Sequence, residues 1–146
     1  MWPSVLRRCV LAIALVGIAS GPIAGDDGGF KLIVHPDNPY DSVDRDFVRD
    51  AYLKKATEWN DGEVIHPIDL APRFRARDKF NENVIRKTAS QLRTYWNQQI
   101  FSGKGVPPPE AESTADVIAY VVANRGAIGY IPADVDPGRA KVIRIR

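Results

Sequence analysis

The stretch Gly126-Ala127-Ile128-Gly129-Tyr130-Ile131 predicts a buried strand near the carboxyl end of the chain. Its aliphatic and aromatic side chains favour a buried, extended conformation, and its two glycines allow another backbone or a ligand to approach closely. A helical pattern precedes it, from the predicted cap Ser113, with Asp116 at the third helical position, to Asn124. A helix that leads into a buried strand through a glycine turn is a unit of an α/β domain.

Hydrophobic periodicity predicts the other elements of a small α/β domain without an internal repeat. Within the helical pattern over residues 75–100, Thr88 and Gln91 form a predicted capping box, so a new helix is expected from Thr88 to Phe101. Pro67 lies near the end of a predicted strand and indicates the edge of a sheet. The remaining expected elements are a strand at 31–35, a helix capped by Asp44 and ending near Lys55, a strand at 63–68, a loop at 101–106, an extended segment at 107–109 and an edge strand at 141–146.

The amino-terminal residues have the features of a secretory signal peptide. Arg7 and Arg8 are basic, and residues 9–19 are apolar apart from Gly17. An apolar run of about a dozen residues is shorter than the roughly 20 that span a bilayer, which favours a cleaved leader over a permanent anchor. We therefore expect a leader at 1–25 and one domain at 26–146, located in the periplasm or secreted, with no membrane contact after cleavage.

Removal of this leader changes the charge and the thiol content of the chain. The full sequence has 20 basic and 18 acidic residues, and without Arg7 and Arg8 there are 18 of each. A mature chain of zero net charge gives no support to nucleic-acid binding. Cys9 is the single cysteine, so the mature domain is expected to have neither a disulfide nor thiolate chemistry.

No constellation in the sequence supports catalysis. His35 and His66 follow or belong to predicted strands, and a histidine pair can bind a metal or transfer protons. No cysteine, His-x-x-x-His spacing or Glu-rich helix accompanies them, so two unrelated histidines are the favoured interpretation. No serine lies in a Gly-x-Ser-x-Gly context. The sequence therefore predicts no catalytic residue, no metal and no cofactor.

A basic cluster is the main candidate site for a ligand. Eight basic residues face only Asp78 and Glu82 in the same interval. Those nearest a predicted helix start would meet free backbone N–H groups, and arginine suits phosphate or carboxylate. A solvated charged face is the alternative interpretation. The cluster consists of Arg73, Arg75, Arg77, Lys79, Arg86, Lys87, Arg93 and Lys104.

Five aromatic residues have two interpretations. They could form a binding surface, but at their spacings a place in the core is favoured. They are Trp59, Tyr95, Trp96, Phe101 and Tyr130.

Several motifs, taken in order, resemble the phosphate-binding component of bacterial phosphate ABC transporters, a type II periplasmic binding protein. The resemblance covers most of residues 31–131 and is most specific at its end. Its motifs are the helix Asp46-Phe47-Val48-Arg49-Asp50-Ala51-Tyr52-Leu53-Lys54-Lys55, the turn Thr57-Glu58-Trp59-Asn60-Asp61-Gly62, Tyr95-Trp96, Phe101-Ser102-Gly103-Lys104-Gly105, Pro107-Pro108 and the strand at 126–131.

The resemblance implies one lobe of that fold, a small mixed sheet flanked by helices, because a full receptor has two lobes that close on phosphate. It also implies a lost ligand set. The family's Arg-x-Asp-Gly-Ser-Gly-Thr stretch aligns with residues 70–76, where Leu70, Pro72, Phe74 and Ala76 replace its arginine, aspartate, serine and threonine.

Two functions follow from these observations. The first is an exported solute-binding domain, not an enzyme, that binds phosphate or another oxyanion for an ABC transporter permease. Arg73, Arg75 and Arg77 would hold the anion, with Asn38 or Ser42 opposite. The second is an interaction module that kept the fold, lost the ligand and contacts an envelope protein.

Overall fold

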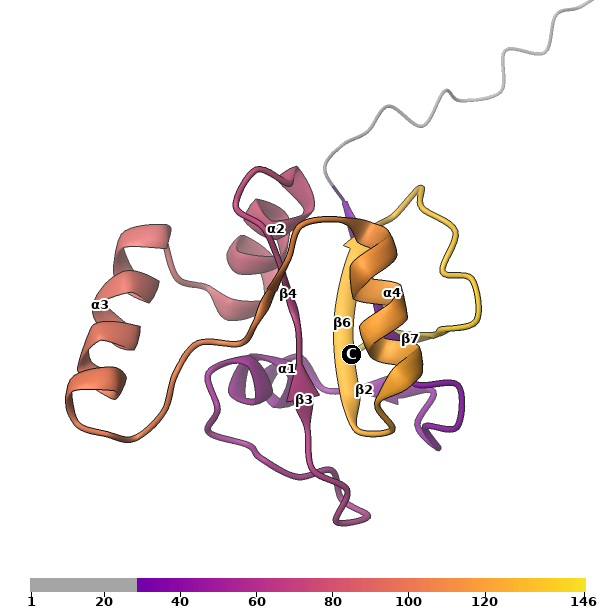
Figure 1. Cartoon of the computed structure of the whole chain (residues 1–146), viewed down its shortest axis with the longest axis horizontal. Coiled ribbons are helices and arrows are strands. Elements are labelled where there is room, and N and C mark those ends of the chain that lie inside the picture. Colours follow the sequence, from indigo (N-terminus) through magenta and orange to yellow (C-terminus); the bar gives the residue numbers. More distant parts are fainter. Residues whose placement is uncertain (1–28) are drawn as a thin grey trace, which may run out of the picture.

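The computed structural model describes residues 29–146, and the predicted leader lies outside the described residues. Its main sheet has five strands in the order β2-β7-β1-β6-β3 (Figure 1). β1 is antiparallel to both β6 and β7, whereas β2 is parallel to β7 and β3 is parallel to β6. The predicted small mixed sheet is therefore confirmed. The strands are β1 (Phe30–Val34), β2 (Ser42–Val43), β3 (His66–Pro67), β6 (Ala127–Pro132) and β7 (Lys141–Ile145).

The two glycines around β6 allow close packing, as the sequence predicts. A Cβ atom on Gly129 would lie 2.9 Å from Val117 Cγ1 and 3.1 Å from Val121 Cγ2, both on the helix α4 (Thr114–Ala123). A Cβ atom on Gly126 would lie 1.7 Å from the carbonyl oxygen of Val64. Gly129 therefore lets α4 approach the sheet, and Gly126 lets the backbone before β3 approach it.

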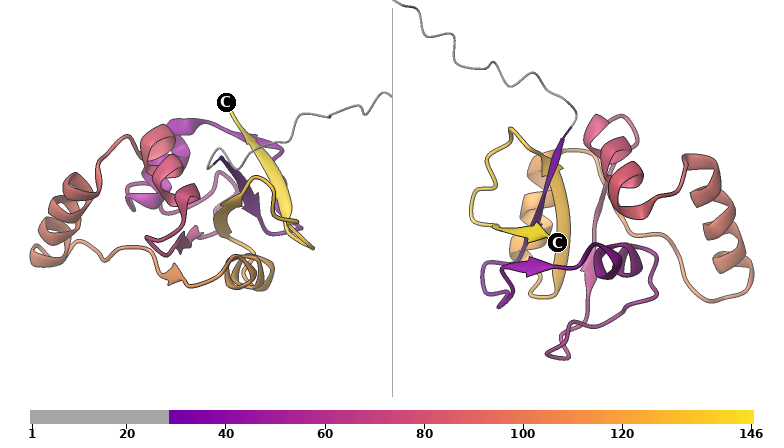
Figure 2. Two further views of the ribbon diagram at one scale, coloured as in Figure 1. Left: turned by 90° about the horizontal axis from the view of Figure 1, so that it is seen from above. Right: turned by 180° about the vertical axis from the view of Figure 1, so that it is seen from behind.

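Alternation along β6 separates the two faces of the sheet. Gly129 faces α4, whereas its neighbour Tyr130 stacks on Phe80 at 4.0 Å between ring centroids. Figure 2 shows α4 on one side of the sheet and α1 (Arg45–Tyr52) and α2 (Arg75–Phe80) on the other. Tyr52 of α1 and Phe30 of β1 also contact the ring of Phe80, at 4.7 and 5.4 Å.

The local signals for helix starts are confirmed. The Thr88 hydroxyl accepts a hydrogen bond from Gln91 N at 3.1 Å, and Gln91 Oε1 accepts one from Thr88 N at 2.9 Å, which begins α3 (Ala89–Phe101). Ser113 caps α4 through Asp116 N at 3.1 Å. Between α2 and α3 the chain forms a π-helical turn, η1 (Asn81–Ile85), which ends at Arg86 with φ of 57°.

Two strand predictions need correction. β7 was expected at an edge, but the two-residue strand β2 pairs with it and is itself the edge. The stretch 63–68 was expected as one strand, but only β3 lies within it, at the edge of the sheet as Pro67 indicates. The chain then enters a second sheet, in which β4 (Asp69–Leu70) pairs in parallel with β5 (Glu110–Ala111). Strands of two residues have no periodicity to detect.

The aromatic residues are only partly in the core. Trp59 and Tyr130 are buried, and the Trp59 indole donates a hydrogen bond to the carbonyl oxygen of Gly126 at 3.0 Å. Tyr95 and Trp96 are half-buried, and Phe101 is exposed, which contradicts its assignment to the core. Both figures show the reason, since α3 lies to one side of the sheet.

Candidate functional site

The three candidate arginines lie around the start of α2 and have different surroundings. Arg75 begins the helix, Arg77 lies in its first turn, and Arg73 precedes it. The N-cap residue Phe74 provides no side-chain hydrogen bond, because it stands where the resemblance expects a serine. This helix start therefore has no side-chain hydroxyl of its own to offer an anion.

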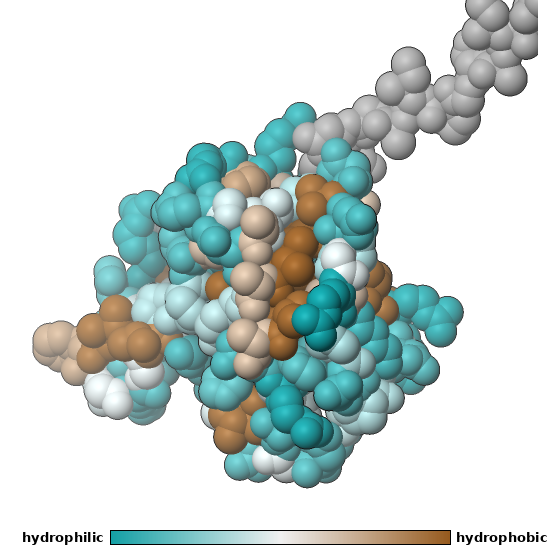
Figure 3. All heavy atoms as spheres, turned by 45° about the vertical axis from the view of Figure 1, so that its right-hand side comes forward, coloured by the Kyte–Doolittle hydropathy of each residue, from teal (hydrophilic) through white to brown (hydrophobic). Residues whose placement is uncertain are grey.

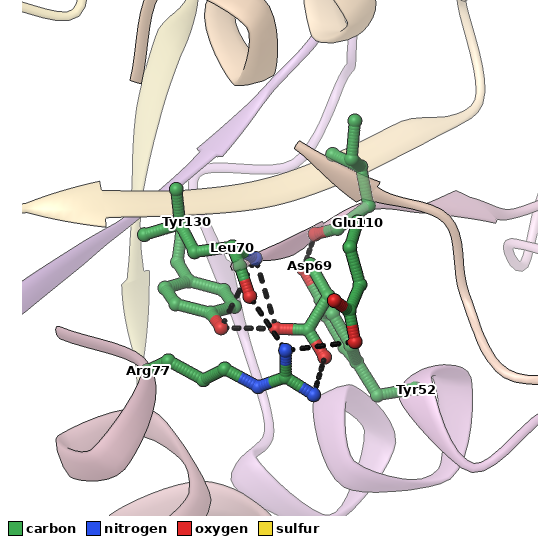
Figure 4. A network of polar contacts seen from close by, with 7 residues as sticks. Tyr52, Asp69, Leu70, Arg77, Glu110 and Tyr130 are labelled. Carbon is green, nitrogen blue, oxygen red and sulfur yellow. Dashed lines mark hydrogen bonds and ion pairs between the residues drawn. The ribbon is translucent and has the colours of Figure 1, made fainter. Parts of the chain in front are cut away.

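Arg77 is held inside the protein by two carboxylates and a carbonyl group (Figure 4). Its Nη1 donates to Leu70 O at 2.8 Å and pairs with Glu110 Oε1 at 2.9 Å, and its Nη2 lies 3.5 Å from Asp69 Oδ2. Only 18% of the Arg77 side chain is exposed. Its charge is therefore used to join α2 to β4 and β5.

Asp69 is the centre of this network. It accepts a hydrogen bond from the hydroxyl of Tyr130, and Tyr52 donates to the neighbouring carbonyl oxygen of Ile68 at 2.8 Å. Burial raises the pKa of Asp69, although Arg77 and the Tyr130 hydrogen bond act in the opposite direction. Burial also raises the pKa of Tyr130, so its hydroxyl remains a donor.

The pKa of Arg77 shows that its carboxylate partners outweigh its burial. Burial lowers this pKa, but Asp69 and Glu110 oppose burial and leave the pKa raised overall. Arg77 therefore stays charged within the network, as a structural cation.

Arg73 and Arg75 are exposed, and they differ in their partners. Arg73 pairs with the carboxylate of Glu112 and also donates to the carbonyl oxygen of that residue. Arg75 has no ion pair within residues 29–146. Of the three arginines, Arg75 is thus the one that the described carboxylates leave unpaired.

Sequence reasoning missed these carboxylates because they come from distant segments. Asp69 and Glu110 face Arg77 from β4 and β5, and Glu112 follows β5. The available signal was the position of Asp69 directly after an apolar predicted strand, since a carboxylate there is expected to be part-buried and paired.

The structure does not bring Asn38 and Ser42 to the arginines. Asn38 follows the carboxyl end of β1, whereas Phe80 of α2 packs on Phe30 at the amino end of that strand. The Asn38 side chain accepts from Tyr40 N at 2.9 Å in a local turn. Ser42 lies in β2, which Figures 1 and 2 place at the other end of the sheet from α2.

A cleft of about 460 Å³ lies beside the Arg77 network. One wall is α3, and the other contains α2, η1 and the proline segment after α3. This volume is in the usual range for small-ligand sites. The lining residues include Phe80, Leu92, Trp96, Ile100 and Pro107.

No metal site is evident in the part of the chain that the structure describes. There, no three His, Cys, Asp or Glu side chains gather closely enough to hold an ion. His35 is used locally, since its Nδ1 accepts from Asp37 N at 3.0 Å, and His66 is exposed in β3.

Solved structures share the fold of residues 29–146. One is a phosphate ABC transporter substrate-binding protein from Clostridium perfringens with bound phosphate, with a TM-score of 0.63 and 23% identity over 80% of this chain. The chain folds as one lobe of such a receptor. An ABC-type phosphate transport receptor from Vibrio cholerae gives 0.63 and 19% over 80% of this chain, and PstS from Borrelia burgdorferi gives 0.59 and 13% over 81%.

The matched region is less than half of each of these proteins. The chain spans 44% of the Clostridium protein, 46% of the Vibrio protein and 47% of the Borrelia protein. No protein-family model matches the sequence, and comparison with curated proteins finds no significant match. Among residues 29–146, no helix combines the length and apolar character needed to cross a membrane.

Proposed function

We propose that this chain is an exported solute-binding domain that binds phosphate or another oxyanion at Arg73 and Arg75 and presents it to an ABC transporter permease. The observation that carries the proposal is the likeness of this lobe to half of a receptor solved with bound phosphate. Arg75 supports it, because this guanidinium is exposed and has no ion pair within the described chain. Arg77 contributes through the position of α2, and Asn38 and Ser42 do not face the anion.

The proposed affinity is low. Three carboxylates, on Asp69, Glu110 and Glu112, pair with Arg73 and Arg77, so the site has little net positive charge. An anion on one lobe also remains half solvated, which screens its attraction to arginine. We expect a dissociation constant on the order of 1 mM.

The test is the melting temperature of the protein in phosphate, sulfate and chloride at matched ionic strength. A ligand at ten times a millimolar dissociation constant stabilises the folded state by about 1.4 kcal/mol. In a domain of this size that raises the melting temperature by about 5 °C. Arg75→Ala should abolish the increase, while Arg139→Ala, a matched change at another exposed arginine without an ion pair in the described residues, should retain it.

A second candidate function is an interaction module in the cell envelope. It is favoured by the pairing of Arg73 and Arg77 with carboxylates, which leaves them unavailable to a free anion. Equal shifts in all three salts, or a phosphate shift that survives Arg75→Ala, would contradict the oxyanion proposal and support this alternative.

A further inference from the structure

The outer end of α3 exposes a group of large apolar side chains. Although α3 has 13 residues, none of them is buried. Ile100 is 53% exposed, Phe101 96% and Val106 57%, and they lie at the end of the helix and in the loop that follows. We call residues 100–106 the α3 tip. Figure 3 shows apolar side chains at the extremity of a protrusion on its left side.

The same part of the chain is basic and contains no acid. Between Glu82 and Glu110 there are four basic residues and no Asp or Glu. Within residues 29–146 none of the four forms an ion pair. The rest of the described chain has 14 basic and 16 acidic residues, so positive charge is concentrated here. The four are Arg86, Lys87, Arg93 and Lys104.

The charge and the shape of the α3 tip select its partner. A second copy would bring four cations against four cations, which opposes self-association. Ile100 and Phe101 are consecutive helical residues and project about 100° apart, so a rigid flat surface could not cover both. A fluid, anionic interface covers a convex apolar tip and also attracts its cations.

We propose that the α3 tip docks the protein on a bilayer that contains anionic phospholipid. Ile100, Phe101 and Val106 enter the interfacial region, and Lys104 and Arg93 lie near the lipid phosphates. The protein rests on the surface and does not span it. This inference is independent of the oxyanion site, and it departs from the expectation that the mature chain has no membrane contact.

The test uses vesicles of phosphatidylcholine alone and vesicles with about 30% phosphatidylglycerol, at low and high salt. The full chain is used with Trp2→Phe in every variant, so that Trp96, one helical turn from Ile100, reports contact with lipid while Trp59 is buried. We expect binding to the anionic vesicles, a blue shift of the emission and quenching by brominated acyl chains. High salt should weaken binding, because attraction to the surface is screened.

Substitutions at the tip separate this proposal from non-specific adsorption and from any effect of the leader, which is the same in all variants. Phe101→Ser should weaken binding about ten-fold or more, and Lys104→Gln about five-fold. Val142→Ser and Arg139→Gln are the controls, since Val142 is 44% exposed on β7 and both lie away from α3. Neither control should change binding by more than about two-fold.

Two results would overturn the proposal. One is the same Trp96 emission with and without anionic vesicles, which would redirect the search to an acidic protein partner. The other is binding that Arg139→Gln reduces as much as Lys104→Gln does, with Phe101→Ser silent. Because Phe101 is exposed, Phe101→Ser should leave the melting temperature unchanged, so loss of fold would not explain loss of binding.

Discussion

Gly126 and Gly129 allow the sheet to pack against its neighbours, and replacing each with alanine tests this reasoning quantitatively. Gly126→Ala places a Cβ atom 1.7 Å from the carbonyl oxygen of Val64. The contact is with backbone, so no side-chain rotation relieves it and the strand or the Val64 segment must move. That movement also disturbs two hydrogen bonds to the Gly126 carbonyl oxygen, from His66 N and Trp59 Nε1, each 3.0 Å long.

The magnitudes follow from what each new methyl group meets. In Gly129→Ala the methyl group meets side-chain atoms at 2.9 to 3.1 Å, which is overpacking of a core that can shift slightly, and we expect a loss of about 1–3 kcal/mol. Gly126→Ala should cost more, about 3 kcal/mol or above, because it adds disturbed hydrogen bonds to the steric contact. Gly105 has no atom within 4 Å of its added Cβ, so Gly105→Ala should change stability by less than about 0.5 kcal/mol.

Urea denaturation followed by tryptophan emission measures all three free energies of unfolding. The expected order of stability is Gly105→Ala, then Gly129→Ala, then Gly126→Ala. A Gly126→Ala protein within 0.5 kcal/mol of the wild type would refute the packing argument, and so would a loss at Gly105 equal to that at Gly129.

Three further predictions concern hydrogen bonds and ionisation. Trp59→Phe keeps an aromatic ring but loses the indole bond to Gly126, and it should cost about 1 kcal/mol in the same denaturation assay. Thr88→Ala removes the α3 cap, worth about 0.5–2 kcal/mol; because α3 buries no residue, faster amide exchange in its first turn should exceed any change in melting temperature. The raised pKa of Asp69 favours its protonated form in the folded state, so its stabilising effect is complete below the ordinary value of 3.8 and is lost as pH rises through the raised pKa. The unfolding free energy of the wild type minus that of Asp69→Asn should therefore increase as pH falls through this window, and a difference that is flat or has the opposite slope would contradict the network.

The features predicted correctly from sequence are those set by neighbouring residues. The capping box at Thr88 and the cap at Ser113 depend on groups three residues apart. β6 is an apolar segment whose glycines need no distant information to be recognised as sites of close approach. The one-lobe fold followed from the order of such motifs along the chain.

The errors concern features that depend on distant partners. The position of β7 in the sheet depends on β2, which is about 100 residues away and only two residues long. Whether an aromatic residue is buried depends on where its helix lies, so Tyr130 is in the core while Phe101, on α3, is in solvent. Periodicity reports a face, but not what covers that face.

The candidate site shows the same division most clearly. Local sequence identified Arg73, Arg75 and Arg77 as a cluster of positive charge near a helix start, and their chemistry is as expected. Their electrostatic state was decided by carboxylates that the fold brings from β4 and β5, 33 to 39 residues from the arginines they pair with across β5. Residue type and spacing along the chain thus specify which charges a segment carries, whereas the energy of a charge depends on distances through space, which exist only once the sheets have formed.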